Sequence, residues 1–201
     1  MPPNLPAPHL VIRDFLSPQE IEELLEWTIE SETRFKSRTL SANGETAVQK
    51  SLLDDLGPST EVFSNRINAQ YADWISKLRL SSFPLSKLEL RIGAYNDGAR
   101  FEYHLDASYR VKNAETTRML TAVYYYFREP MQFSGGDLRL YDIGAGPGSQ
   151  AFKPIAPEQN TLLVFPSWVG HDVTTVHCPS QHFADSRFAV NCWLHRPSPE
   201  A

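Results

Sequence analysis

Residues 95–106 read Tyr95-Asn-Asp-Gly-Ala-Arg-Phe-Glu-Tyr-His104-Leu105-Asp106. A turn signal, Asn96-Asp97-Gly98, comes early in this stretch, and an extended run that ends in the His-x-Asp triplet follows it. Side chains two residues apart on a strand point to the same face, so the imidazole of His104 and the carboxylate of Asp106 can converge on one ion. The triplet alone is weak evidence, because such short patterns also occur by chance in solvated loops.

A second histidine strengthens the hypothesis of a metal site. The run Leu162-Leu-Val-Phe-Pro-Ser-Trp-Val-Gly-His171-Asp-Val reads as an apolar strand, a turn, and a histidine that opens the next strand. Two histidines and one carboxylate occupy one face of an octahedral ion and leave three positions open, which is typical of non-haem Fe(II) oxygenases. Zinc held by the same three ligands and one water, as in hydrolases, is the competing interpretation.

The strand predicted over 187–193 favours iron. In Arg187-Phe-Ala-Val-Asn-Cys-Trp193, alternation puts Arg187, Ala189, Asn191 and Trp193 on one face. We expect Arg187 at the start of this strand, beside the strand that His171 opens. An inward guanidinium needs an anion, and it binds a carboxylate through two parallel hydrogen bonds. A dicarboxylate could therefore be held at one end while its other end meets the metal.

Short runs of strand-forming residues follow Pro84 and are separated by turns such as Gly144-Ala-Gly-Pro-Gly148. Helical patterns come first and many short strands come afterwards. This order predicts an α+β, mainly β fold, a jelly roll or a similar double sheet with helices packed on its outer face. The predicted strands span 87–95, 120–127, 137–141, 161–165, 172–176 and 187–193.

The N-terminal part of the chain reads as helical support for these strands. After a short strand over 9–15, Ser17-Pro18 supplies a helix N-cap and a proline at the first helical position. A β-hairpin is predicted over 34–51, around Asn43-Gly44. Apolar residues recur at spacings of three and four over 58–80, which predicts a second amphipathic helix.

The chain has 201 residues and a formal net charge of −5. This length predicts one domain over 1–201, with helical support over 1–84 and the strand core over 85–196. The acidic balance argues against nucleic acid as a partner. The longest apolar runs are far shorter than the roughly 20 residues that cross a bilayer. With no signal-peptide pattern and only Cys178 and Cys192, we expect a cytoplasmic protein without a membrane partner.

In their order, these motifs resemble those of the 2-oxoglutarate and Fe(II)-dependent dioxygenases, specifically the prolyl 4-hydroxylase-like branch. The resemblance covers roughly 87–193. Six ordered matches are specific where any single one is not. They are Tyr95 followed by Gly98, His104-Leu-Asp106, Arg118-Met-Leu-Thr-Ala-Val-Tyr-Tyr-Tyr126, Ser134-Gly-Gly-Asp-Leu-Arg-Leu-Tyr141, Phe165-Pro-Ser-Trp-Val-Gly-His171-Asp-Val and Arg187-Phe-Ala-Val-Asn-Cys-Trp193.

This resemblance implies a double-stranded β-helix, which is also described as cupin-like, and it implies roles for site residues. Three residues would be the catalytic metal ligands that hold iron, and three would bind 2-oxoglutarate, with Arg187 gripping its far carboxylate. The implied metal ligands are His104, Asp106 and His171, and the implied cofactor-binding residues are Arg187, Tyr125 and Tyr95.

Two alternatives stay open within this assignment. Tyr124, one residue away and facing oppositely, is the alternative to Tyr125. The gap from His171 to Arg187 is longer than is usual in the family, and we expect it to extend a hairpin tip. Arg118 and Arg110 are the alternative anchors for the carboxylate.

The resemblance also implies a reaction. The protein would be a hydroxylase that oxidises an unactivated C–H bond of a prolyl or other protein residue, or of an amino-acid-like small molecule, and releases succinate and CO2. It would use Fe(II), 2-oxoglutarate as cosubstrate and O2, with ascorbate as a further candidate cofactor. A metal-binding jelly roll that is not an oxygenase, either a zinc hydrolase or a ligand-sensing module, is the alternative.

Two further expectations concern residues outside the motifs. The polar stretch 107–117 is a candidate lid over the iron. His9, His177, His182 and His195 are expected to be exposed histidines rather than additional ligands.

Overall fold

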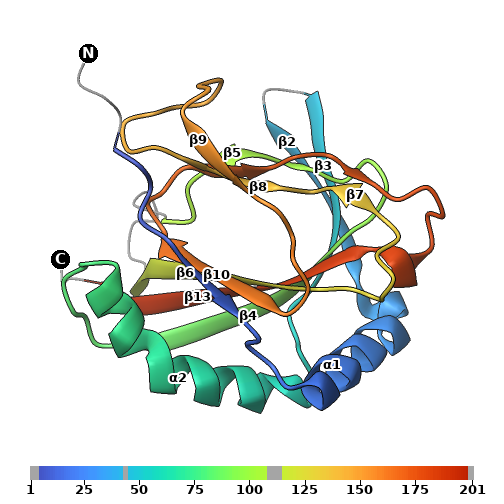
Figure 1. The fold of residues 1–201 in the computed structure, drawn as a ribbon, viewed down its shortest axis with the longest axis horizontal. Helices are drawn as coiled ribbons and strands as arrows, with labels where there is room; N and C mark the ends of the chain where they lie inside the picture. The colour runs from blue at the N-terminus through green and yellow to red at the C-terminus, as the bar shows by residue number, and fades with distance from the viewer. Residues whose placement is uncertain (1–4, 43–44, 108–114, 199–201) are drawn as a thin grey trace.

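The computed structural model describes residues 5–42, 45–107 and 115–198 and, apart from 38–51, their side chains. The hairpin tip Asn43-Gly44, the alternative anchor Arg110 and most of the candidate lid lie outside the described residues. Within them, two antiparallel sheets face each other, and two helices cover the outer face of the larger sheet (Figure 1). This is the predicted jelly-roll arrangement.

The larger sheet has seven strands in the order β1-β10-β6-β13-β4-β3-β2. Three of them, β1 to β3, come from the N-terminal part of the chain, which therefore extends the sheet as well as supporting it. The hairpin predicted over 34–51 is confirmed by the antiparallel pairing of β2 with β3. The strands are β1 (Leu10–Arg13), β2 (Lys36–Ala42), β3 (Glu45–Leu53), β4 (Lys87–Tyr95), β6 (Thr116–Tyr126), β10 (Thr161–Pro166) and β13 (Arg187–Pro197).

The smaller sheet has four strands in the order β5-β11-β8-β9, and a two-stranded ribbon of β7 with β12 lies beside it. One strand was predicted over 172–176, but the chain forms β11 and β12 there. Thr174 and Thr175 interrupt the ladder because they bond instead to the turn at Gly136-Asp137. The strands are β5 (Phe101–His104), β7 (Ser134–Gly135), β8 (Leu138–Tyr141), β9 (Phe152–Ile155), β11 (His171–Val173) and β12 (Val176–His177).

The expected position of Arg187 beside the strand of His171 is wrong. Strand β13, which begins at Arg187, pairs on one side with β4 and on the other with β6, so both of its edges are occupied. Strand β11, which begins at His171, pairs with β5 and β8 in the smaller sheet. The two residues therefore belong to opposite sheets.

Helix α1 (Pro18–Glu30) begins where the sequence predicts. Ser17 is its N-cap, and the Glu20 side chain accepts a hydrogen bond from the Ser17 backbone N–H in a capping box. Helix α2 (Ser59–Lys77) is slightly shorter than the predicted 58–80. It ends there because Arg79 adopts a left-handed conformation with φ of 55°.

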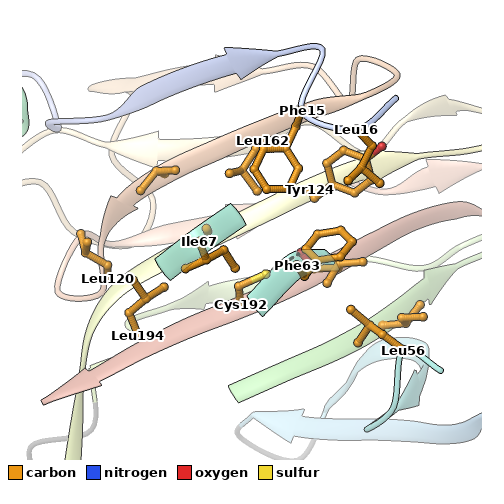
Figure 2. Packing of buried hydrophobic residues seen from close by; sticks show 14 of the residues in the cluster. Phe15, Leu16, Leu56, Phe63, Ile67, Leu120, Tyr124, Leu162, Cys192 and Leu194 are labelled. Carbon is orange, nitrogen blue, oxygen red and sulfur yellow. Dashed lines mark hydrogen bonds between the residues drawn. The ribbon is translucent and has the colours of Figure 1, made fainter. Parts of the chain in front are cut away.

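Both helices pack on the face of the larger sheet that points away from the smaller sheet (Figure 1). Phe63 and Ile67 of α2 meet Leu162 of β10 and Cys192 of β13, as Figure 2 shows. Every second residue of the central strands contributes to this layer. The alternate residues of the same strands face the smaller sheet, and they build the interior in which the functional side chains lie.

Candidate active site

His104, Asp106 and His171 come together at one end of the interior between the sheets. His104 ends β5 and His171 opens β11, and the two residues are direct antiparallel partners. One ligand atom from each of the three side chains lies within 4.8 Å of the others, the only such group of three or more among the described residues. The structure thus brings together the three residues that the sequence predicted as metal ligands.

Both imidazoles are oriented by backbone carbonyls. Nδ1 of His104 lies 2.9 Å from the carbonyl oxygen of Glu102, and Nδ1 of His171 lies 2.9 Å from that of Val169. A carbonyl only accepts, so Nδ1 carries the proton in each ring, and Nε2 keeps its lone pair. Both Nε2 atoms face Asp106, at 3.6 Å for His104 and 3.5 Å for His171.

The ionisation states of the triad suit a cation. Burial acts to raise the pKa of the Asp106 carboxyl, but the His171 and His104 imidazoles hold it well below its usual range. Burial lowers the pKa of His171 to about 4, and His104 adds to this effect while Asp106 opposes it. At neutral pH the site therefore offers one carboxylate and a neutral His171 imidazole, which are the forms that bind metals.

A buried arginine lies in the same interior. Arg187 is 1% exposed, and its Nε and Nη1 atoms have no hydrogen-bond partner among the described residues. Its guanidinium carbon lies 4.7 Å from the ring centroid of Tyr95 and 4.9 Å from that of Tyr125. A buried charge is costly by several kcal/mol unless it is paired, so the unbonded Nε and Nη1 would stabilise an anion bound beside them.

Tyr125 and Tyr124 point to opposite faces of the larger sheet. The Tyr125 hydroxyl is buried beside Arg187 and has no hydrogen-bond partner within the described ranges, and burial raises its pKa to about 12. It therefore keeps its proton and remains a donor. Tyr124 packs against Phe15 and Phe63 on the helical side, and its hydroxyl bonds to Asn160 Oδ1 at 3.0 Å. Only Tyr125 of the two faces the interior.

Gly136 gives Arg187 its room. A Cβ on Gly136 would lie 2.6 Å from Cδ of Arg187 and 2.9 Å from Cγ2 of Val176, and the residue has φ of +72°. From the sequence, Gly136 was placed only within the motif 134–141, so this contact with the arginine was missed. A glycine is required both by the backbone conformation and by the side chain packed against it.

One pocket joins the triad to the arginine. The predicted face of β13 is confirmed, because Arg187, Ala189, Asn191 and Trp193 all line it. The other lining residues are Leu52, Arg91, Tyr95, Phe101, His104, Leu105, Asp106, Arg118, Val123, Leu138, His171 and Val173.

Arg118, an alternative anchor, is already paired. It donates two hydrogen bonds of 2.8 Å to Glu89, and its guanidinium stacks at 4.0 Å on the ring of Trp193. Nη1 of Arg118 lies 4.0 Å from Asp106 Oδ1, and Arg118 also lines the pocket. The charge of Arg118 is thus neutralised by Glu89.

His195 is not the exposed histidine that the sequence predicted. It is 6% exposed, and Nε2 lies 3.2 Å from Glu89 Oε2 while Nδ1 lies 3.0 Å from Thr116 Oγ1. Its position near the C-terminus suggested exposure, but β13 continues to Pro197, so His195 lies within the larger sheet, opposite Lys87 of β4 and Arg118 of β6. His177 and His182 are exposed as predicted.

The donor set fits iron and a dicarboxylate. Two imidazole nitrogens and one carboxylate oxygen are the facial ligands of a non-haem iron site. The orphaned Nε and Nη1 of Arg187 and the orphaned Tyr125 hydroxyl are donors buried in the same pocket, which suits a carboxylate. Fold and site together define a class of jelly-roll proteins with three side chains that could hold a metal ion and a buried arginine that could bind an anion.

Comparison with known proteins places this chain in a family. The model of the 2OG-Fe(II) oxygenase superfamily matches residues 90–195, which include the triad and Arg187. The chain belongs to this superfamily of 2-oxoglutarate-dependent dioxygenases, whose cofactors are Fe(II), 2-oxoglutarate and O2. Membership favours an oxygenase over the zinc hydrolase or sensing module.

Relatives point to the prolyl hydroxylase-like branch. The chain is 32% identical over 198 residues to an uncharacterized PKHD-type hydroxylase of Synechocystis sp., with 96% of this chain covered. It spans 64% of that relative's length. A prolyl-4-hydroxylase of Pseudomonas putida shares the fold with a TM-score of 0.67 at 18% identity, covering 94% of both chains. A Trichoplax adhaerens prolyl hydroxylase, solved with a peptide fragment of hypoxia inducible factor, has a TM-score of 0.63 at 20% identity over 94% of this chain and 83% of that one.

Among the described residues, no helix is long and apolar enough to span a membrane.

Proposed function

We propose that this protein hydroxylates an unactivated C–H bond and couples that step to the oxidative decarboxylation of 2-oxoglutarate. The observation that carries the proposal is a buried Arg187, whose Nε and Nη1 have no hydrogen-bond partner among the described residues, in the same pocket as a triad of two histidines and one aspartate. A plain metal site does not explain unbonded guanidinium nitrogens on a buried cation, whereas a dicarboxylate chelated to the metal would.

His104, Asp106 and His171 would hold Fe(II), with Nε2 of each histidine and one oxygen of Asp106 as donors. Arg187 would bind the far carboxylate of 2-oxoglutarate, Tyr125 would donate a hydrogen bond from its hydroxyl to the same carboxylate, and Tyr95 would pack beside them. Bound iron supplies the redox chemistry, in which one atom of O2 enters the product hydroxyl, the other enters succinate, and the keto acid's carboxyl leaves as CO2.

The substrate that we propose is a prolyl or other residue of a peptide or protein, or an amino-acid-like small molecule. A peptide is supported by the shared fold of the Trichoplax prolyl hydroxylase, which was solved in complex with a peptide fragment. A neutral substrate group, rather than an additional anion, is supported by the two other arginines that line the pocket, because Arg91 pairs with Asp54 and Arg118 with Glu89.

The experiment is turnover of the purified chain with Fe(II), 2-oxoglutarate and O2 against a peptide library and a panel of free amino acids. Succinate is quantified, and a gain of one oxygen is sought by mass spectrometry. We expect succinate formation to depend on all three cofactors and to be lost in His104→Ala. Ascorbate is tested as an addition that sustains turnover. Absence of succinate with every substrate, together with no affinity for 2-oxoglutarate, would refute the proposal.

A further inference from the structure

Two buried hydroxyl groups adjoin the triad without a role in the function above. Thr121 is 1% exposed and Ser167 is fully buried. Oγ1 of Thr121 donates to Asp106 Oδ2 at 2.8 Å and lies 3.0 Å from Oγ of Ser167. An ionised carboxylate only accepts hydrogen bonds, so the single O–H of Thr121 is directed at Asp106. The hydroxyl of Ser167 must therefore donate its own hydrogen bond to the Thr121 oxygen. The bonds form a directed chain from Ser167 through Thr121 to Asp106.

Ser167 also connects the two segments that carry the triad. Its carbonyl accepts the N–H of Ala107 at 2.8 Å, and Ala107 directly follows Asp106. Its own N–H donates to the carbonyl of Met119 on β6 at 3.0 Å. The turn that contains Ser167 leads into His171. The backbone of Ser167 is therefore hydrogen-bonded both to β6, which carries Thr121, and to Ala107, which follows Asp106. Ser167 also lies just before His171 in the chain.

The orientation of the Asp106 carboxylate matters for a site of this kind. Its oxygens are divided between the histidines, with Oδ1 3.6 Å from Nε2 of His104 and Oδ2 3.5 Å from Nε2 of His171. A facial triad leaves three positions open only while the carboxylate uses one oxygen. Rotation of the carboxylate would let the second oxygen take a position that the cosubstrate needs. A hydrogen bond on Oδ2 opposes that rotation.

We infer that Thr121 is a positioning residue that fixes the Asp106 carboxylate, and that Ser167 supports it by polarising the Thr121 hydroxyl. The inference rests on the proposed assignment of Asp106 as a metal ligand. Donation by Ser167 strengthens the bond from Thr121, because linked hydrogen bonds polarise one another in a low-dielectric interior. Neither hydroxyl touches the metal or the substrate in this arrangement.

The test measures binding of Mn(II) to the whole chain by calorimetry without O2, followed by titration of 2-oxoglutarate at saturating Mn(II). Thr121→Val removes the donor, Ser167→Ala removes its support, and Thr121→Ser keeps a hydroxyl at the same position. Thr28→Val is the matched control, since Thr28 is equally buried and its hydroxyl bonds to Tyr126 on the helical side of the sheet. Unfolding temperatures are recorded for all variants.

We expect Thr121→Val to weaken Mn(II) binding by about tenfold or more, as loss of an outer hydrogen-bond partner does in other metal sites. Its affinity for 2-oxoglutarate should fall as well, Ser167→Ala should lie between it and the native protein, and Thr121→Ser should restore native binding. Thr28→Val should lower the unfolding temperature and leave metal affinity unchanged.

Native Mn(II) affinity in folded Thr121→Val overturns the inference. If that variant does not fold, Ser167→Ala decides, and native affinity in it overturns the inference too. A native chain that binds no Mn(II) at all refutes instead the assignment of the triad under the proposed function. The two failures are thus distinguishable.

Discussion

The guanidinium of Arg187 lies 4.9 Å from the ring centroid of Tyr125, and the two buried groups present three polar atoms that have no hydrogen-bond partner in the part of the chain that the structure describes. They come from adjacent strands, since Ala189 of β13 is the direct partner of Tyr125 on β6. Together they provide hydrogen-bond donors beside the pocket that the triad also lines. A carboxylate bound at this end would meet a cation and a hydroxyl donor at once.

Replacing Arg187 with alanine should remove the anchor for 2-oxoglutarate. Truncating one partner of a buried charge pair costs about 2–5 kcal/mol, so the affinity should fall roughly 30-fold or more. Arg187→Lys should recover only part of the 2-oxoglutarate affinity, because an ammonium group cannot form the bidentate hydrogen bonds of a guanidinium. Calorimetry on the Mn(II)-loaded chain measures the change. Arg13→Ala, which breaks an exposed pair with Glu158, is the control, and equal affinities in the two variants would contradict the assignment.

Tyr125→Phe and Tyr124→Phe form a matched pair that separates the two faces of β6. The first removes a hydroxyl without a partner, so stability should hold while 2-oxoglutarate affinity falls about three- to tenfold, the worth of one hydrogen bond. The second removes a bond to Asn160, so stability should fall by about 1 kcal/mol and affinity should hold. Urea unfolding and calorimetry check both outcomes. The reverse pattern would assign the cosubstrate to Tyr124.

Gly136→Ala should disable the anchor without touching the triad. The new Cβ would collide with Cδ of Arg187 and displace the guanidinium. We expect 2-oxoglutarate binding to be lost and Mn(II) binding to persist. Gly144→Ala is the control, because Gly144 also has a positive φ but a Cβ there would meet nothing within 4 Å. Retention of native 2-oxoglutarate affinity in Gly136→Ala would show that Arg187 is not the anchor.

Glu89 should make stability depend on pH in the acid range. Burial acts to raise its pKa, but hydrogen bonds from His195 and Arg118 outweigh burial and lower the pKa to about 2. Below the ordinary value of 4.5 the unfolded chain takes up a proton that the folded chain does not, so stability is full above that pH and falls as pH drops toward about 2.

Denaturant unfolding measures how much Glu89 contributes to the pH dependence of stability, with a second variant as the control. The shift corresponds to at most about 3 kcal/mol, and solvent screening reduces it to roughly 1–2 kcal/mol. Glu89→Gln should flatten the dependence of unfolding free energy on pH between about 5 and 3. Glu158→Gln, at an exposed pair, should leave it as in the native protein. If the unfolding free energy of Glu89→Gln depends on pH as steeply as that of the native protein, the hydrogen bonds of Glu89 with His195 and Arg118 do not contribute to acid stability.

Local sequence patterns predicted much of the fold correctly. The capping residues at Ser17-Pro18 marked the start of α1, and alternation in β13 gave the inward face from Arg187 to Trp193. Both signals depend only on neighbours in the chain, because helix caps and the two-residue repeat of a strand are local geometry. The His-x-Asp triplet is also a local signal. It predicted that His104 and Asp106 converge, and they do, although β5 ends at His104 and Asp106 follows in a bend rather than in an extended strand.

Which strands pair, and which face turns inward, was decided only by the tertiary structure. Arg187 lies in the sheet opposite His171 because β4 and β6 occupy both edges of β13. His195 is buried because Glu89, remote in sequence, bonds to it, and the link from Ser167 through Thr121 to Asp106 joins three segments by hydroxyl contacts. Alternation fixes faces only within a strand, whereas these contacts depend on strand order and packing between distant segments, which leave no local pattern in the sequence.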